Sequence, residues 1–535
     1  MMETWSASLD LVKLKKDFGT PLYLFHPGQL EQNIHDFLAL VQVPRNIAFP
    51  LKACPAAPVL YTMARAGLSA DCASPQEILM ALDVGFSYER IFYNSPDLAE
   101  AEAKALLKAG GVVVLNDTAQ LALFAGKGDK CEGQIFLRWN PDSPDDPSAN
   151  NAFTAHGRRD TQFGCSSEAI LSLDRHQLRL IRGIHTHIGS RVKSVDLFIL
   201  ALKKMHALTD NIYQQTGHRI SQLNMGGGLK LPMNQKDECP TISDYTCALR
   251  PFLRPHYRYI IEPGNALAGN VMGLLTTVKS LKSRTGGGRF AIVDAGSNQL
   301  LKYTLSSIPP AILDPDHAAL PLEGNDVVAG PLCFAGDILI PGTSLSGVKP
   351  GTPLLVQHCG AYCLALSNQF NGRFRPAVLA IGEDNQPFLC CNAEVPLLTS
   401  PAFHGLKWQY DSQKRPEVIS VPDVRSTHTD VISALRTGKE SVCFEIHLTR
   451  HFVVSEILTL TETLARSTIG EIYPDMRIQD VNCFVFLPGS KDWFMKGRRS
   501  GLFFSSGRET PTGINITFGS KDRLLGYYSF EVKTC

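Results

Sequence analysis

Eight short runs rich in β-forming residues recur through the first half of the chain, and each precedes a stretch whose apolar residues repeat at helical spacing. The runs cover residues 46–52, 68–72, 90–94, 112–116, 134–139, 180–187, 222–225 and 257–262. The helical stretches between them include 56–66, 75–84, 99–109 and 195–215. This alternation indicates parallel strands joined by helices. Eight units predict an α/β chain with a (β/α)8 TIM barrel at about residues 26–270.

The chain continues well beyond this barrel. Its 535 residues exceed what one hydrophobic core supports, so two or three domains are expected. From residue 271 the pattern changes to short strands with Gly and Pro turns, at 288–294, 326–330, 353–357 and 376–380. We therefore predict an all-β barrel domain formed by residues 1–25 and 271–398. Residues 399–535 combine a helical run at 455–467 with strands such as 481–486, which predicts an additional α+β C-terminal domain of unknown role.

Composition narrows the class of partner. Charged residues make up 19% of the chain and the formal net charge is +1, which gives no electrostatic signature for nucleic acid. The 14 cysteines are scattered without Cys-x-x-Cys modules, which favours neither a disulfide framework nor a bound metal. No stretch has the length and apolar character of a membrane span or a signal peptide. We expect a cytoplasmic protein that binds a small molecule and no membrane.

Lys52 ends the first strand, in the run Ile47-Ala48-Phe49-Pro50-Leu51-Lys52. A lysine at the mouth of a parallel strand can be desolvated, lose its proton and attack carbonyl carbons as a Schiff-base nucleophile. Because the strand ends of a barrel share one pocket, later strand ends must supply its partners.

Three other strand ends carry unusual residues. The sixth contains two alternating histidines, His185 and His187, and we expect one of them on the pocket side, although a core histidine fits the pattern as well. The seventh ends in three glycines whose amides can approach a phosphate, although they also suit a tight turn. The eighth ends in Glu262, a carboxylate that needs a cation or a donor to stay charged. The three glycines are Gly226, Gly227 and Gly228.

Together these residues describe a pyridoxal 5'-phosphate site. Lys52 would hold the aldehyde as an imine, and Glu262 would keep the pyridine nitrogen protonated. His187 would stack on the ring, and the three glycines would hold the phosphate.

The chain resembles the alanine racemase-like, fold type III pyridoxal phosphate decarboxylases, which include diaminopimelate and ornithine decarboxylases. The resemblance runs from about residue 20 to residue 391. It is carried by Leu51-Lys52-Ala53, His187-Ile188-Gly189-Ser190, Gly226-Gly227-Gly228, Glu262-Pro263-Gly264, Asp294-Ala295-Gly296, Gly330-Pro331-Leu332-Cys333, Asp337 and Gly360-Ala361-Tyr362.

This resemblance implies roles for several further residues. Tyr362 and Gly264 would contribute to cofactor binding. Cys333 and Asp337 would enter the active site of the opposing subunit, which implies a homodimer with shared sites. After loss of carbon dioxide, Cys333 would return a proton to Cα.

The departures from the family pattern fall at the far end of the substrate. Phe334 replaces a glutamate of diaminopimelate decarboxylases, Lys302 replaces an arginine, and Ser306 replaces a tyrosine. Asn265 replaces the arginine of Glu-Pro-Gly-Arg. Since lysine cannot reproduce a bidentate guanidinium contact, the resemblance implies another substrate. We expect a diamino acid of the ornithine or diaminopropionate type, or such a moiety conjugated to citrate as in siderophore assembly.

Two other functions remain compatible with the same residues. A racemase on this fold would conserve carbon, whereas a decarboxylase releases carbon dioxide and an amine. A catalytically silent, decarboxylase-like binding or regulatory protein is the alternative from another class.

Overall fold

The computed structural model describes residues 5–124, 133–142, 157, 161–382, 386–391 and 393, together with the backbone of six strands beyond residue 399. Two compact units divide the chain, residues 1–399 and residues 400–535. Each unit is described by itself below.

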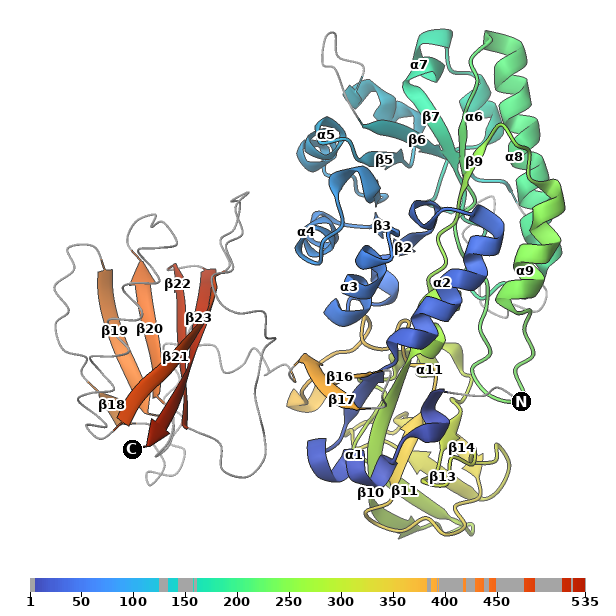
Figure 1. Cartoon of the computed structure of the whole chain (residues 1–535). Helices are drawn as coiled ribbons and strands as arrows, with labels where there is room; N and C mark the ends of the chain where they lie inside the picture. The colour runs from blue at the N-terminus through green and yellow to red at the C-terminus, as the bar shows by residue number, and fades with distance from the viewer. Residues whose placement is uncertain are drawn as a thin grey trace. The chain divides into compact units, whose positions relative to one another are not determined.

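Eight parallel strands form a barrel in the first unit (Figure 1). They are β2 (Ala48–Pro50), β3 (Ser69–Cys72), β4 (Ile91–Asn94), β5 (Val112–Leu115), β6 (Gln134–Arg138), β7 (Ile181–His185), β8 (Gln222–Asn224) and β9 (Arg258–Ile260). Each strand pairs with the next in chain order. The barrel closes where the N–H of Ala48 donates to the carbonyl of Ile261 at 2.8 Å, beside an Ile47–Ile261 bridge. The predicted eight-stranded parallel barrel is therefore confirmed.

The strands have apolar residues on both faces because helices cover the outside and side chains fill the inside. Phe92 and Phe136 meet edge to face in the interior, with ring centroids 5.8 Å apart. Gly183 on β7 makes room for them, since a Cβ there would lie 2.5 Å from the Phe136 ring.

Helices connect the strands and surround them (Figure 1). They are α2 (Pro27–Val41), α3 (Ala57–Arg65), α4 (Pro75–Asp83), α5 (Glu100–Lys108), α6 (Ser167–Leu171), α7 (Arg175–Leu180), α8 (Val195–Thr216), α9 (Ile242–Leu249) and α10 (Asn265–Ala268). The Ser74 hydroxyl begins α4 by accepting the Glu77 N–H, and Gly217 ends α8 in the left-handed conformation. Short 3-10 helices include η3 (Leu51–Ala53), directly after β2. None of the described helices has the length and apolarity needed to cross a membrane.

A mixed β-sheet forms the rest of the first unit. Its strands are β1 (Leu22–Phe25), β10 (Met272–Ser283), β11 (Arg289–Val293), β12 (Ile312–Leu313), β13 (Asp326–Ala329), β14 (Ile338–Thr343), β15 (Pro353–Val356), β16 (Ala377–Ile381) and β17 (Pro387–Cys391). The main order is β14-β13-β11-β10-β1-β16-β17, with β15 on β10 and β12 on β15. The β1–β16 and β11–β13 pairs are parallel and the others antiparallel. Two further helices, α1 (Leu11–Phe18) and α11 (Leu301–Ser306), accompany this sheet.

The second unit contains one six-stranded sheet in the order β18-β19-β20-β22-β23-β21. Its strands are β18 (Glu417–Ile419), β19 (Thr429–Arg436), β20 (Val442–Leu448), β21 (Met476–Val485), β22 (Thr512–Ser520) and β23 (Arg523–Thr534). The strand expected at 481–486 falls on β21, whereas the helical run expected at 455–467 lies outside the described residues.

Candidate active site

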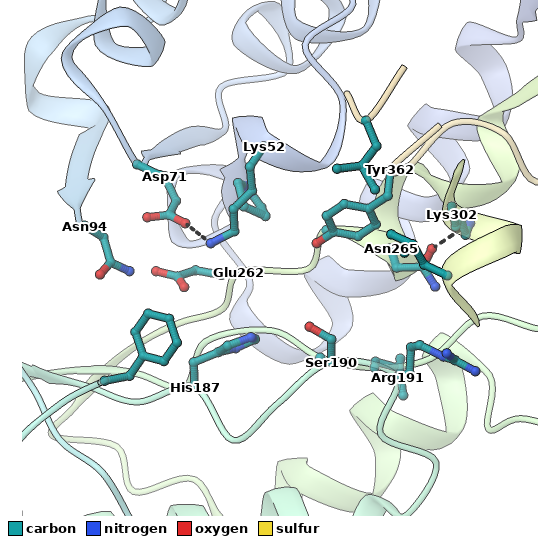
Figure 2. A pocket seen from close by; sticks show the side chains of 18 of the residues that line it. Lys52, Asp71, Asn94, His187, Ser190, Arg191, Glu262, Asn265, Lys302 and Tyr362 are labelled. Atoms are coloured by element: carbon teal, nitrogen blue, oxygen red, sulfur yellow. Dashed lines mark hydrogen bonds and ion pairs between the residues drawn. The ribbon is translucent and has the colours of Figure 1, made fainter. Parts of the chain in front are cut away.

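A cavity of about 480 Å³ lies at the carboxyl ends of the barrel strands. Seven strands deliver lining residues at or just beyond their ends, and two segments of the mixed-sheet region complete the wall. The barrel residues include Lys52, Asp71, Asn94, Arg138, His187, Ser190, Arg191, Gly228, Glu262, Gly264 and Asn265, and the others include Lys302, Leu305, Ser306, Tyr362 and Leu366. Figure 2 shows Lys52, Glu262 and His187 grouped around the same space.

Lys52 lies in η3, directly after β2, and its amine points into the cavity (Figure 2). Its Nζ is 3.8 Å from Oδ2 of Asp71. Burial lowers the pKa of Lys52, but the charge of Asp71, helped by Tyr362 and Glu262, outweighs burial, so the pKa is raised overall. The amine of the cofactor-free chain therefore carries a proton at neutral pH, contrary to the expectation that desolvation alone would remove it.

Asp71 was not predicted from the sequence. It occupies β3, where it pairs in register with Pro50, two residues before Lys52. Its side chain is 2% exposed, and Oδ1 has no hydrogen-bond partner among the described residues. Burial, followed by the charge of Glu262, raises the pKa of Asp71 to about 8.

Glu262 follows β9 and is held by two side chains. Asn224 donates to Oε1 at 2.7 Å, and Nε2 of His185 lies 3.1 Å from Oε2. Nδ1 of His185 has no partner among the described residues, which fits a neutral imidazole whose proton sits on Nε2 and is donated to Glu262. Burial opposes ionisation of Glu262, but His185 and Lys52 outweigh it and lower its pKa. Glu262 is thus an ionised carboxylate in an enclosed site.

The two histidines at the carboxyl end of β7, His185 in the strand and His187 just beyond it, have different surroundings. His185 is fully buried behind Glu262, and burial lowers its pKa. His187 lines the cavity, and its Nδ1 accepts the N–H of Gly227 at 3.2 Å. The sequence indicated that one of the pair faces the pocket, and that residue is His187.

The three glycines form a turn in which side chains have no room. Gly226 and Gly228 adopt φ angles of 65° and 119°, which favour glycine. A Cβ on Gly227 would lie 1.9 Å from the carbonyl oxygen of Glu262. Of the three, Gly228 lines the cavity directly.

Tyr362 reaches the cavity from the loop after β15. Its backbone N–H donates to the carbonyl of Ala53 at 2.7 Å, which ties this loop to the Lys52 segment. A Cβ on Gly264 would lie 3.1 Å from the Tyr362 hydroxyl, so the glycine also leaves space beside that oxygen.

Arg138 is a second lining residue that sequence reasoning missed. It ends β6 and is 7% exposed, with its guanidinium 4.4 Å from the centre of the Phe163 ring. Burial lowers its pKa, while Glu262 and Asp71 oppose that change. The sequence signal that could have identified Arg138 is its position at the end of a predicted strand.

Lys302 lies on α11 at the other end of the cavity. It is 8% exposed, and its Nζ donates to Oδ1 of Asn265 at 3.3 Å and to the carbonyl of His358 at 3.1 Å. Burial lowers its pKa. Ser306, on the same helix, also lines the wall.

Besides Gly226 and Gly227 of the glycine turn, three predicted residues do not line the cavity of their own chain. Cys333 and Phe334 are exposed, the latter at 52%. Asp337 is 3% exposed, and its carboxylate accepts the N–H groups of Ser297 at 2.6 Å and Leu332 at 2.9 Å. Its carboxylate is therefore engaged in anchoring its own loop, whereas Cys333 and Phe334 are free to meet another molecule.

Known proteins share this architecture. A family model for the pyridoxal-binding domain of pyridoxal-dependent decarboxylases matches residues 28–269. Diaminopimelate decarboxylase of Vibrio cholerae is 31% identical over 400 residues, covering 72% of this chain and 93% of that protein. The Zymomonas mobilis enzyme is 29% identical over 383 residues, covering 68% and 88%.

Solved structures agree on the fold. The diaminopimelate decarboxylase of Helicobacter pylori, complexed with L-lysine, has a TM-score of 0.64 at 23% identity, covering 72% of this chain and 96% of that one. A Vibrio vulnificus lysine/ornithine decarboxylase complexed with putrescine has a TM-score of 0.58 at 20% identity, covering 69% and 97%.

The parallel barrel, the mixed sheet and the matched pyridoxal-binding region define an enzyme of the alanine racemase-like fold that uses pyridoxal 5'-phosphate. Within that class the chain belongs to the fold type III pyridoxal phosphate-dependent decarboxylases, and it is a diaminopimelate decarboxylase-like amino-acid decarboxylase.

The residues of the cavity fit this cofactor. The amine of Lys52 and the ionised carboxylate of Glu262 line the same cavity. The aldehyde of the cofactor requires such an amine, and its pyridine nitrogen requires such a carboxylate. A Cβ at any position of the glycine turn would collide with neighbouring backbone, so the turn presents bare backbone beside the cavity. The buried, unpartnered Oδ1 of Asp71 leaves an acceptor for a bound donor.

Proposed function

We propose that the enzyme removes the α-carboxylate of an amino acid whose side chain carries a second functional group, either a diamino acid or an amino-acid conjugate, with Lys52 as the covalent anchor of the cofactor. The observation that carries the proposal is that Lys52 and Glu262 line one cavity, close enough for the charge of Glu262 to raise the lysine pKa. If these two side chains lined separate cavities, the proposal would be excluded.

Each lining residue has a task in this proposal. Glu262, kept ionised by His185 and Asn224, holds a proton on the ring nitrogen. His187 would pack against the ring, and the Gly226–Gly228 turn, Gly264 and Tyr362 would hold the phosphate. Asp71 holds Lys52 in place through their 3.8 Å contact.

When bound, pyridoxal phosphate supplies an electron sink for the pair of electrons left at Cα after carbon dioxide departs. The chain must then deliver a proton to Cα. We assign that proton to Cys333 of a second copy, because the thiol is exposed and lies outside the cavity of its own chain. The chain would thus act as a homodimer with shared sites, and Phe334 of the second copy would contact the substrate.

The test combines a spectrum with a gas measurement. Purified holoenzyme should show the visible absorbance of an imine, and Lys52→Ala should lose it together with carbon dioxide release from a panel of diamino acids and their conjugates. Lys108→Ala, an exposed lysine at the end of α5, is the matched control and should change neither. An imine band that survives Lys52→Ala would contradict the assignment. Conversion of substrate without carbon dioxide would indicate racemisation, and cofactor binding without any turnover would indicate a binding protein.

A further inference from the structure

Two loops that follow neighbouring barrel strands are paired with one another. The first follows β7, and the second follows β8 and begins with the glycine turn. Val192 and Leu229 form a parallel bridge between them. The N–H of Val192 donates to the carbonyl of Gly228 at 2.9 Å, and the N–H of Lys230 donates to the carbonyl of Val192 at 3.2 Å. The backbone therefore joins the two loops at this point.

The residues around this pairing form part of the cavity wall. Figure 2 shows Ser190 and Arg191, from the first loop, on the wall that faces Tyr362. The relative position of the two loops therefore sets the shape of this wall. The lining residues that the paired segments contribute are Ser190, Arg191, Gly228, Leu229 and Met233.

The side chain of Asp237 joins the same two loops a second time. Lys193 and Lys230 each directly follow a residue of the bridge. Both of their amines meet Oδ1 of Asp237, that of Lys193 at 3.2 Å. Oδ2 of Asp237 accepts the N–H of Met233 at 3.1 Å. One carboxylate therefore binds a group from each loop and closes a turn within its own.

The contacts of Asp237 are largely enclosed. The side chains of Asp237 and Lys230 are 8% and 3% exposed, whereas that of Lys193 is 32% exposed. Burial opposes ionisation of Asp237, but Lys230, the N–H of Met233 and Lys193 outweigh burial and lower its pKa. Asp237 is thus an ionised carboxylate, and its removal would leave the buried charge of Lys230 unpaired.

The loop of Asp237 is also fixed to the mixed-sheet region. The carbonyl of Met233 accepts the N–H of Ala311 at 2.9 Å. The side chain of Asn234 donates to the carbonyl of Pro309 at 2.8 Å. The second loop is therefore held on the mixed-sheet side, and Asp237 extends that restraint to the first loop.

We propose that Asp237 is a positioning residue of the cofactor site. Through its two lysines it fixes the loop after β7 against the glycine turn, and so sets the opening in which the phosphate is held. This inference rests on the proposed function, in which the glycine turn holds the phosphate. Asp237 does not line the cavity, so it acts through the two loops. Lys52 follows β2 and lies on neither loop, so its reaction with an aldehyde that lacks the phosphate should not depend on Asp237.

The test compares pyridoxal 5'-phosphate with pyridoxal, the same aldehyde without its phosphate. Each is titrated into the cofactor-free full chain, and imine absorbance reports binding. Asp237→Asn removes the carboxylate, whereas Lys193→Met removes only the link to the first loop and keeps the buried pair of Lys230 with Asp237. Lys193→Arg retains the cation and is the conservative variant. Glu323→Gln is the matched control, because Glu323 pairs with Lys236 of the same loop but is 82% exposed.

We expect Lys193→Met to raise the Kd of pyridoxal 5'-phosphate by about 2- to 5-fold, the effect of losing a partly exposed ion pair. Asp237→Asn should raise it by about 10- to 100-fold, because a buried charge then loses its partner. The Kd of pyridoxal should stay unchanged in both. Lys193→Arg and Glu323→Gln should match the wild type.

Hydrogen exchange in the cofactor-free protein gives a second measurement that needs no ligand. In Lys193→Met the N–H groups of Val192 and Lys230, which donate between the loops, should exchange faster than in the wild type. Glu323→Gln should leave their exchange unchanged.

Three results would overturn the inference. Equal weakening of pyridoxal and its phosphate would assign Asp237 to general stability alone. Unchanged affinity of Lys193→Met for the phosphate form would do the same, even where Asp237→Asn fails to fold. Faster exchange without a change in phosphate affinity would show joined loops that do not position the cofactor. A loss confined to the phosphate form, in a protein that releases no carbon dioxide from any amino acid, would instead sustain the positioning role and defeat the proposed function.

Discussion

At the scale of single residues, the protonation of Lys52 depends on a carboxylate rather than on burial. The sequence predicts the lysine because a cation at the end of an apolar strand is conspicuous. It does not predict Asp71, because one polar residue within a strand looks like any other until the β2–β3 register places it beside Pro50. The sequence also does not predict that His185 contacts Glu262, because the two residues are 77 positions apart and only the fold brings them together.

Asp71→Asn should make cofactor attachment faster at neutral pH. The substitution removes the largest influence that raises the lysine pKa, so burial prevails and the pKa falls. The neutral amine that attacks an aldehyde is then more abundant at pH 7. Stopped-flow absorbance after mixing cofactor-free protein with pyridoxal phosphate should show a pH midpoint shifted downward. Asp36→Asn, at a half-buried position of α2 outside the cavity, is the control, and an unshifted midpoint in Asp71→Asn would refute the coupling.

His185→Leu should weaken cofactor binding through Glu262. The carboxylate would keep Asn224 as its donor and lose the imidazole, so its pKa should rise. The loss of one donor to a buried carboxylate costs about 1–3 kcal/mol, which corresponds to a loss of affinity of about 5- to 150-fold. His185→Gln, which can still donate to Oε2, should recover most of it. Equilibrium titration with pyridoxal phosphate measures both, and equal losses in the two variants would show that packing alone is involved.

At the scale of elements, regular strands were predictable and irregular ones were not. The barrel strands are continuous apolar runs because parallel strands are buried on both faces. The long strand β10 was not predicted, since its first seven residues are buried whereas four of its last five are exposed. Side-chain alternation therefore holds over neither half. The N-terminal β1 pairs with β10 and β16, and a pairing between segments so far apart has no local signal.

The glycine turn after β8 gives a prediction at this scale. Gly227→Ala places a methyl group 1.9 Å from the Glu262 carbonyl oxygen, so the turn must move away from β9. We expect a loss of about 1–3 kcal/mol in unfolding free energy, because an overpacked site strains the backbone around it. Cofactor affinity should fall at the same time. Chemical denaturation and cofactor titration measure the two effects. Gly286→Ala, where a Cβ meets nothing within 4 Å, should leave both unchanged, and a Gly227→Ala protein that matches it would contradict the tight fit.

At the scale of the whole molecule, the two loops that contain Cys333 and Asn371, together with helix α11, expose large apolar side chains. Leu305, Phe334, Phe370 and Phe374 are 61%, 52%, 49% and 52% exposed. The N–H of Cys333 donates to Oδ1 of Asn371 at 2.8 Å, which joins two of these loops. Exposed apolar groups of this size, of which Leu305 also lines the cavity, suit a surface that another copy covers.

A mixing experiment tests whether two copies share each site. Lys52→Ala and Cys333→Ala should each be nearly inactive alone. In a homodimer with shared sites, an equal mixture reassociated from separated subunits contains half hybrid dimers, and each hybrid has one site with both Lys52 and Cys333 intact. Carbon dioxide release should therefore recover to about a quarter of the wild-type value per subunit. If both residues served the site of their own chain, every site in the mixture would lack one of them and no activity would return. Mixing Lys52→Ala with a Lys52→Ala/Cys333→Ala double variant is the control, and it should stay inactive because no subunit can then supply the lysine.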